Sequence, residues 1–381
     1  MRADAPPVPA IGGGLRPALG PLLLPAAALA LALALPLGLD AQGYAIRVIA
    51  LVYLFGAMSQ SWNIVGGLAN QISLGHAAFF GIGAYTSTLL LIHSGLSPWL
   101  GMLAGGALGG LAAGLISVPT MRLRGHYFAL ATLAFGEVMR VVANAWSGLT
   151  GGPVGISVPY APPSLAMLSF KTTLPFYYLN LVALIVVTAI FVGIRRSAFG
   201  YRLRAVRENA QAAEVVGVDT ARVKIQAAML SGALTAMLGT LYAQLNFFFD
   251  PDAVFGAAPI SIRIALIAIV GGIGTASGPI LGAVLIVALE EAANALLSGQ
   301  VAGLSNLVYG LILIAVILIQ PHGLVALRGI SRRTGRGRDE RAAAGGFHRA
   351  GPRDPLEYPR GGQTLRRAPG ASGHQLHGRR G

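Results

Sequence analysis

Four polar residues interrupt an otherwise apolar stretch, and they are the first candidates for chemistry. The segment from Gly66 to Tyr85 reads GGLANQISLGHAAFFGIGAY and contains Asn70, Gln71, Ser73 and His76 among five glycines. Glycine weakens a continuous helix, and polar side chains are costly in lipid unless they face a cavity or a partner. Broken helices of this kind line the pathways of transporters. The segment is therefore a candidate translocation pathway; the alternative is a tightly packed re-entrant corner in which His76 makes an internal hydrogen bond.

A charged segment between two apolar stretches holds the second set of candidates. It runs from Ser197 to Lys224 and reads SAFGYRLRAVRENAQAAEVVGVDTARVK. Asn209 is a predicted N-cap, residues 210–216 a short helix, and Gly217 the residue that ends it. The segment therefore predicts a compact helical loop, which we define as residues 197–222.

The predicted loop helix has features of a contact with another protein. A short amphipathic helix held by charged flanks fits a groove on a soluble partner, and its small residues keep its surface flat. The alternative is a surface helix with no partner. Asp219 or Thr220 is expected to cap the membrane span that follows. The candidate contact residues are Arg207, Glu208, Asn209, Ala212, Ala213 and Gly217.

Two pairs of charged residues lie within apolar stretches. Glu137 and Arg140 are three residues apart, so they share one helical face and can form an ion pair. An unpaired charge at the centre of a membrane helix costs about 2.5 to 3.5 kcal/mol. We therefore expect a structural pair near the outer end of the helix in preference to a substrate site. Glu290 and Glu291 are expected to form an interfacial pair, because nothing beside them completes a proton relay.

Several classes of chemistry are excluded. The chain has no Cys, which excludes disulfides, thiolate nucleophiles and Cys-ligated metal sites. Neither Lys171 nor Lys224 lies in a GxxxxGK(S/T) phosphate-binding loop, so the chain is not expected to hydrolyse ATP itself. We expect no enzyme activity, and accordingly no catalytic residue, cofactor or metal.

The candidates must be positioned by helices that cross a membrane. Of the 381 residues, 54% are hydrophobic and 11% are charged, whereas a soluble domain carries about 25% charged residues. A span needs roughly 20 apolar residues. The pattern predicts an all-α, polytopic transmembrane helical bundle of about ten spans, with eight as the lower bound. The stretches lie near residues 18–39, 46–66, 72–92, 98–119, 126–146, 175–194, 223–248, 260–275, 279–297 and 304–320.

The basic residues predict the orientation of the spans, because cytoplasmic loops are enriched in Arg and Lys. With the N-terminus inside, the basic residues of segments 2–16, 122–124 and 195–224 are cytoplasmic, and both termini are predicted to be cytoplasmic. The long loop at residues 148–173 is then outside, where an extracytoplasmic partner would dock. The first stretch is broken by Pro25, and a signal peptide is its alternative.

The composition divides the chain into three parts. Residues 1–17 form a predicted cytoplasmic N-terminal segment, and residues 18–328 the transmembrane domain. Residues 329–381 hold 12 Arg and four acidic residues among many Gly and Pro, which predicts a disordered basic tail. A basic arm can bind nucleic acid or anionic lipid. We favour a solvated extension and expect no nucleic-acid partner.

Glycines predict close approaches between helices. One stretch carries Gly101, Gly105 and Gly109 in one row and Gly106, Gly110 and Gly114 in the next, and small residues four apart let helix backbones approach in lipid. A weaker echo of the first broken segment, GGIGTASGPILG, covers residues 271–282. The echo is too short to establish an internal repeat.

Several of these segments together resemble one family. Residues 66–85 are similar to the GxLSLGHAAFFGIGAY segment of the branched-chain amino acid permeases of the LivM type, in which Gly usually stands at the position of Asn70. LATLAFGEVMRVVANAWSGLTGGPVGI, residues 130–156, is similar to a second hallmark, and residues 271–282 followed by QPHGL resemble the end of the family. The loop at 197–224 resembles the EAA-like cytoplasmic loop of ABC importer permeases. The resemblance covers most of residues 45–327, and the tail departs from it.

The resemblance implies an ABC importer permease fold in the bacterial inner membrane, with leucine, isoleucine and valine as substrates. It also implies four kinds of contact: a second homologous permease subunit, two cytoplasmic ABC ATPase subunits, a periplasmic substrate-binding protein and membrane lipid. ATP-driven closure of the ATPases would move the loop helix and switch the pathway from outward-open to inward-open. A urea, amide or aromatic-acid importer would look nearly identical, and an ion-coupled secondary transporter would need no ATPase.

Overall fold

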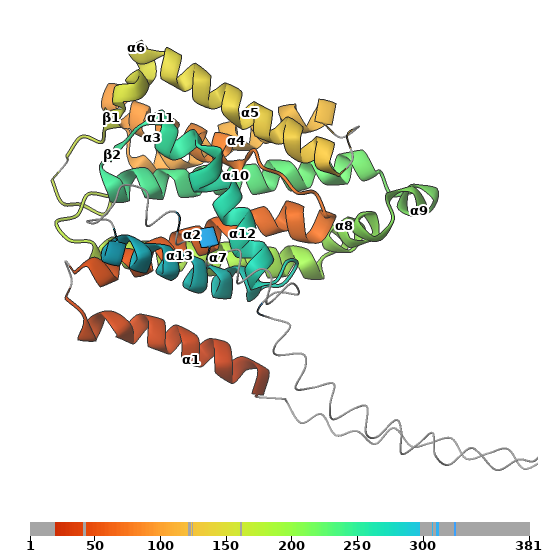
Figure 1. Ribbon diagram of the computed structural model, residues 1–381, viewed down its shortest axis with the longest axis horizontal. Coiled ribbons are helices and arrows are strands. Elements are labelled where there is room, and N and C mark those ends of the chain that lie inside the picture. Colours follow the sequence, from red (N-terminus) through yellow and green to blue (C-terminus); the bar gives the residue numbers. More distant parts are fainter. Residues whose placement is uncertain are drawn as a thin grey trace, which may run out of the picture. The chain divides into compact units, whose positions relative to one another are not determined.

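The computed structural model describes residues 20–40, 43–120, 123, 125–160, 162–297, 307, 310, 311 and 324. The predicted segments 1–17 and 329–381 lie outside these residues, as does nearly all of the stretch at 304–320. The described part is almost entirely helical (Figure 1). Its longer helices are α1 (Gly20–Ala34), α2 (Tyr44–Ala69), α3 (His76–Ser94), α4 (Pro98–Thr120), α5 (His126–Ala145), α7 (Leu174–Arg196), α8 (Ala198–Glu208), α10 (Thr220–Asn246), α12 (Arg263–Gly271) and α13 (Gly278–Leu297).

Short elements connect the longer helices. Strands β1 and β2 pair antiparallel, with Ile156 opposite Phe249 and Ser157 opposite Phe248. The short elements are η1 (Leu35–Gly38), α6 (Ser147–Thr150), η2 (Gly152–Val154), β1 (Ile156–Ser157), α9 (Ala210–Val215), β2 (Phe248–Phe249), α11 (Pro251–Phe255) and the π-helix η3 (Ala257–Ile262).

The prediction of an all-α, polytopic bundle is confirmed, with differences in span length. Seven of the described helices are long and apolar enough to cross a membrane: α2, α3, α4, α5, α7, α10 and α13. Two predicted spans are shorter. In place of the first predicted span there is a shorter apolar helical segment, Ala26–Gly38, which ends in the 3-10 helix η1 with a Pro in its first turn. In place of the eighth there is Ala257–Gly271, which begins as the π-helix η3.

Helix α10 packs against α2, α3 and α4, and glycines make the contacts close. A Cβ on Gly101 or Gly105 would meet α3, whereas one on any of the other four glycines, Gly106, Gly109, Gly110 and Gly114, would meet α10. The predicted glycine rows of α4 are thus confirmed as packing surfaces for two neighbouring helices. Large side chains at these positions would separate the helices.

Helix α2 packs on its other side against α7, α12 and α13. Arg263 of α12 forms an ion pair with Glu290 of α13 at 2.8 Å, and its guanidinium lies 3.8 Å from the ring centre of Phe55. Glu291 accepts a hydrogen bond from the Tyr44 hydroxyl at 2.6 Å. The two carboxylates that were expected to form an interfacial pair therefore have separate partners, because neighbouring residues of a helix point in different directions.

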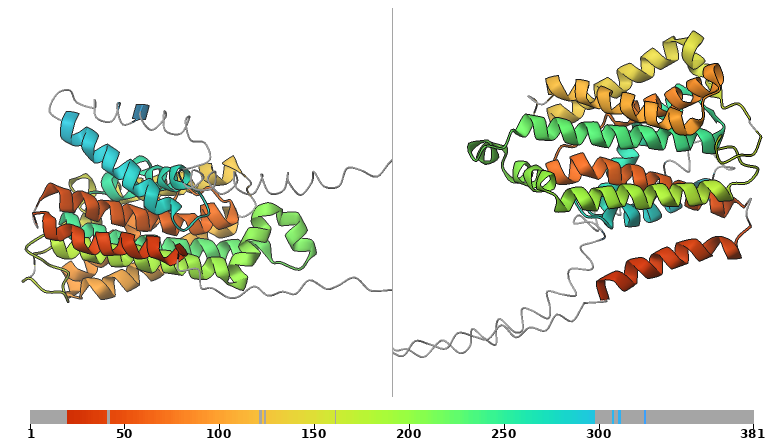
Figure 2. Two further views of the ribbon diagram at one scale, coloured as in Figure 1. Left: turned by 90° about the horizontal axis from the view of Figure 1, so that it is seen from below. Right: turned by 180° about the vertical axis from the view of Figure 1, so that it is seen from behind.

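The two ends of the bundle carry different elements. Helices α8 and α9 extend beyond one end of the long helices, while α6, β1 and β2 lie at the opposite end, as both Figure 1 and the rear view in Figure 2 show. Glycines with positive φ at 151, 152 and 155 turn the chain after α5 so that β1 reaches β2. This pairing places α11 against α5.

Gly83 is expected to be intolerant of any side chain. A Cβ there would overlap the backbone carbonyl of Ala236, whereas one on Gly193 of α7 would meet nothing within 4 Å. Gly83→Ala should therefore lower the free energy of unfolding by about 1 to 3 kcal/mol through overpacking. Gly193→Ala, the matched control, should leave it unchanged or raise it by up to about 1 kcal/mol. Thermal unfolding of the two variants in detergent checks this, and equal stability would contradict the packing.

Candidate translocation and coupling site

The predicted break in the segment 66–85 is present in the structure. Helix α2 ends at Ala69 and α3 begins at His76, with non-helical backbone between them. Asn70 ends α2 in the left-handed region, at φ 54°, and its N–H donates to the carbonyl of Val65. Asn is the non-glycine residue that most readily takes this conformation. This conformational preference explains how Asn70 can occupy a position at which the segment it resembles usually has Gly.

Side chains from other helices bind the backbone of the break. The Trp62 indole donates from Nε1 to the carbonyl of Ser73 at 2.7 Å, and the N–H of Leu74 donates to Thr132 Oγ1 at 3.0 Å. Polar backbone groups away from water need such partners. The break is therefore a defined structure held by α2 and α5.

His76 lies in the interior of the bundle and makes an internal hydrogen bond, as expected if the segment is a tightly packed re-entrant corner. Its Nε2 lies 2.9 Å from Ser231 Oγ, and that hydroxyl donates to the carbonyl of Ser61 at 2.7 Å. A hydroxyl has one proton to donate, so His76 Nε2 must be the donor to Ser231. The cavity beside His76 has a volume of about 10 Å³. No amino acid fits there in this conformation.

The four candidate pathway residues do not share one environment. Gln71, Ser73 and His76 are buried, whereas Asn70 is exposed at the end of α2. The structure thus brings three of them into the bundle and leaves the fourth at its surface. Their role in transport stays a prediction.

The second glycine-rich segment meets the first in space. Asn63 of α2 donates from Nδ2 to the carbonyl of Thr275 at 2.9 Å, and its Oδ1 accepts the N–H of Gly274 at 2.7 Å. A Cβ on Gly67 would lie 2.7 Å from the nitrogen of Gly274. The weak sequence echo at 271–282 is therefore a second break that packs directly against the end of α2.

The loop at 197–222 contains two helices where one was predicted. Helix α8 precedes α9, so Arg207 and Glu208, which were expected to flank a single helix, belong to a helix of their own. Leu203 and Val206 of α8 are buried. With the apolar residue at 199 they repeat at helical spacing, and this signal was overlooked among the five basic residues of 195–207.

The predicted caps of α9 are confirmed. Asn209 Oδ1 accepts the N–H of Ala212 at 3.0 Å. Gly217 has φ 88°, its N–H donates to Glu214, and the N–H of Val218 donates to Ala213. These two bonds form a Schellman motif, which ends a helix at a left-handed glycine.

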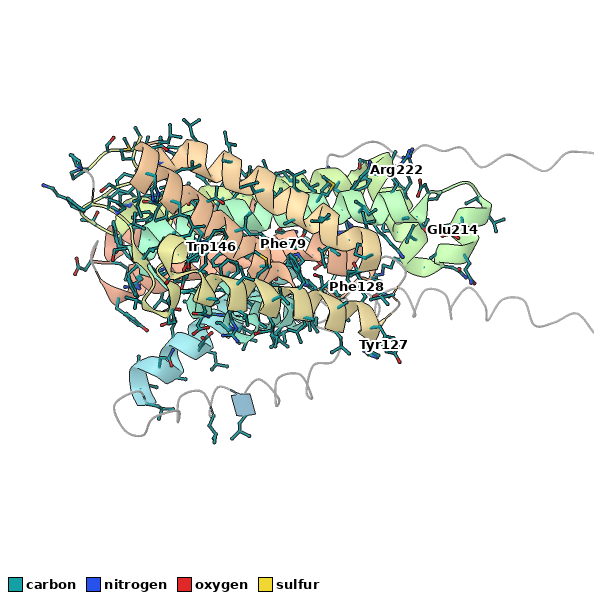
Figure 3. All side chains as sticks on the ribbon, turned by 90° about the horizontal axis from the view of Figure 1, so that it is seen from above. Phe79, Tyr127, Phe128, Trp146, Glu214 and Arg222 are labelled. Carbon is teal, nitrogen blue, oxygen red and sulfur yellow. The ribbon has the colours of Figure 1, made fainter. Side chains whose placement is uncertain are left out.

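The tip of α9 presents apolar side chains to the outside. Val215 and Val216 are 88% and 78% exposed, whereas Ala213 is buried and Ala212 is exposed. Figure 3 shows Glu214 and Arg222 at this projecting end of the molecule. The two valines were not among the predicted contact residues, although two adjacent apolar residues in a charged loop were an available signal. Such a tip suits a groove on another protein.

Arg207 connects the loop to the break. Its Nη1 donates to the carbonyl of Gly67 at 2.8 Å, and it lies beside Gly274. The last carbonyls of a helix have no partner within the helix and carry partial negative charge, so a guanidinium binds there favourably. One side chain thus contacts both glycine-rich breaks from the loop.

Comparison with known proteins decides the family. The family model described as "Branched-chain amino acid transport system / permease component" matches residues 44–317. The chain belongs to this family. It is therefore a multi-pass permease component of an ABC transporter, and not a catalytic subunit. No solved structure matches it.

Named relatives of the permease differ in substrate. The high-affinity branched-chain amino acid permease protein LivM of Escherichia coli K12 is 31% identical over 306 residues, which cover 74% of this chain and 69% of the relative. LivM of Salmonella typhimurium LT2 is 32% identical over the same shares. The nucleoside ABC transporter permease protein NupC of Lactococcus lactis is 25% identical over 242 residues, 57% of this chain and 74% of the relative.

Substitutions of Asn70 should separate backbone strain from side-chain chemistry. Because φ is 54°, Asn70→Gly should keep the free energy of unfolding within about 0.5 kcal/mol, whereas the β-branched residue in Asn70→Val should lower it by about 1 to 2 kcal/mol. Thermal unfolding in detergent measures both. A valine variant as stable as the glycine variant would show that the break does not need a left-handed residue.

Proposed function

We propose that this permease translocates the branched-chain amino acids leucine, isoleucine and valine across the bacterial inner membrane. The support is the 31–32% identity to two LivM permeases over three quarters of the chain. The nucleoside relative is more distant and matches a smaller share of this chain. Urea, amides and aromatic acids are the alternative substrates.

The observation that carries the coupling mechanism is the hydrogen bond from Arg207 to Gly67. Two cytoplasmic ABC ATPases would bind the exposed tip of α9. Val215 and Val216 would lie in a groove on the surface of the ATPases. Their ATP-driven closure would move the tip, and α8 follows because it shares Asn209 with α9 as C-cap and N-cap. Arg207 would then shift the end of α2.

Displacement of the end of α2 would change the proposed pathway. Asn63 and Gly67 contact the second break, and Trp62 binds the first. A shift of this helix end therefore acts on both breaks at once. We infer that the segment with Asn70, Gln71, Ser73 and His76 changes between outward-open and inward-open arrangements in response.

The other partners follow from the same orientation. A second, related permease would complete the passage, and a periplasmic binding protein would deliver the substrate at the end that carries residues 148–173. Both termini would then be cytoplasmic, on the side of α8 and α9. In the loop at 197–222, Asn209 and Gly217 hold the shape of α9, while Glu208 at the end of α8 and Ala212 within α9 are exposed.

Uptake by the complete reconstituted complex tests the substrate and the energy source. Leucine uptake should require ATP and the binding protein, and excess isoleucine or valine should compete, whereas urea, phenylalanine and uridine should not. Dissipation of the proton gradient should leave uptake unchanged. Uptake that survives removal of ATP would favour the secondary transporter, and competition by uridine alone would favour a nucleoside importer.

Replacement of Arg207 should uncouple the ATPases from transport. A charge-assisted hydrogen bond contributes about 1.5 to 3 kcal/mol, so Arg207→Gln should lower uptake and substrate-stimulated ATP hydrolysis about tenfold or more. Arg204→Gln is the matched control on α8, because among the described residues Arg204 contacts its own neighbourhood: it donates to the carbonyls of Gly200 and Arg195 and lies over the ring of Tyr201. It should stay within about twofold of the wild type.

Co-purification of the ATPases controls for assembly in both variants. Arg207→Gln should retain them, because the docking tip of α9 is unchanged. Wild-type uptake and ATPase stimulation in Arg207→Gln would show that the contact with Gly67 does not transmit the motion.

A further inference from the structure

Two groups of acidic and basic side chains in the bundle differ in their surroundings. The side chains of Arg263 and Glu290 are 13% and 24% exposed and lie between α12 and α13. The side chains of Glu137, Arg140 and Asp252 are 42%, 33% and 65% exposed. The first group is enclosed by the bundle, whereas the second is turned outward from this chain.

Glu137, the innermost member of the outward group, lies well within the length of a membrane-spanning helix. Glu137 is eight residues from the end of α5 at Ala145, which is about 12 Å along the helix axis. Ionised side chains at such depth seldom face lipid; they face protein or a water-filled cavity and mark substrate pathways. Figure 3 shows α5 on the outside of the bundle, with Tyr127 and Trp146 near its two ends. This face of α5 therefore needs water or another polar surface beside it.

The fold assembles the group from two segments. Glu137, Arg140 and Asn144 are spaced by three and four residues, so they form one stripe on α5. Arg140 Nε lies 2.8 Å from Glu137 Oε2, and Arg140 Nη1 lies 2.6 Å from Asp252 Oδ1. Asn144 Nδ2 donates to the same oxygen of Asp252 at 3.1 Å. The structure thus confirms the predicted Glu137–Arg140 pair and adds a second carboxylate from α11.

The charges alternate along the group. Hydrogen bonds from Arg140 and Asn144 hold the pKa of the Asp252 carboxyl below its usual range, so it is ionised at neutral pH. A guanidinium has five N–H donors, and the two carboxylates occupy only some of those of Arg140. Val138 and Val141, both exposed, lie beside the charges on α5.

The geometry points to this group as the surface that binds the charged head of a zwitterionic α-amino acid during translocation. The substrate carboxylate would bind the Arg140 guanidinium, and its ammonium group would bind Glu137 or Asp252. The aliphatic side chain would lie against Val138 and Val141. The inference rests on the proposed function, in which a related permease covers this face of α5 and encloses the passage.

The test measures leucine taken up per ATP hydrolysed by the complete reconstituted complex with loaded binding protein. Glu137→Gln and Arg140→Gln should retain ATPase stimulation by the loaded binding protein while uptake per ATP falls about tenfold or more, because a polar site discriminates strongly when one partner is lost. Arg140→Lys, which keeps the charge, should recover part of the loss. Glu291→Gln is the control, because it removes a carboxylate near the end of α13 whose side-chain partner among the described residues is Tyr44.

Two results would overturn the inference. One is unchanged uptake per ATP in both Gln variants. The other is an equal loss of uptake, ATP hydrolysis and thermal stability that Arg140→Lys does not relieve, which is the behaviour of an ion pair that only holds α11 to α5.

The proposed function fails separately, if the wild-type complex takes up no leucine. The same variants are then tested with the ligand identified for the binding protein. A selective loss with a zwitterionic ligand supports the inference, whereas a loss with an uncharged ligand, or no loss, overturns it.

Discussion

The absence of hydrogen-bonding solvent in the membrane interior governs this structure. A helix that breaks there exposes backbone groups which only the protein can satisfy. The break after Ala69 depends on Trp62 and Thr132, and the break near Gly274 depends on Asn63. Because Trp62 and Asn63 are neighbours on α2 and Thr132 lies on α5, the breaks cannot move independently of these two helices.

Close packing of the helices also prevents them from moving independently of one another. Glycines bring α3, α4 and α10 within backbone contact, and Gly67 lies equally close to Gly274. Such surfaces have few intermediate arrangements, because a small displacement loses many contacts. A bundle built in this way changes conformation by movement of whole helices, and Arg207 is placed where a movement of the loop reaches the end of α2.

Charge is used in two different ways. Arg263 and Glu290 neutralise one another inside the bundle, where an unpaired charge would be costly. Glu137, Arg140 and Asp252 also neutralise one another, yet they lie at the surface of a chain whose other exposed side chains on α5 are largely apolar. A mixed-charge group of this kind is compatible with membrane depth only beside water or protein, which is the environment of a transport passage.

Local features of the sequence were sufficient for much of this protein. The apolar stretches, the cap at Asn209, the left-handed turn at Gly217 and the pairing of Glu137 with Arg140 all depend on residues within one or two helical turns, so their chemistry can be read along the chain. Helix α8 was not predicted from the sequence, because its few buried apolar residues lie among many charged residues. Only the tertiary structure decided that Asp252 joins Arg140 from 112 residues away, that Glu290 and Glu291 have separate partners, and that Gly67 meets both Gly274 and Arg207. These contacts depend on how the helices pack, and helix packing is set by many side chains at once and not by any local pattern.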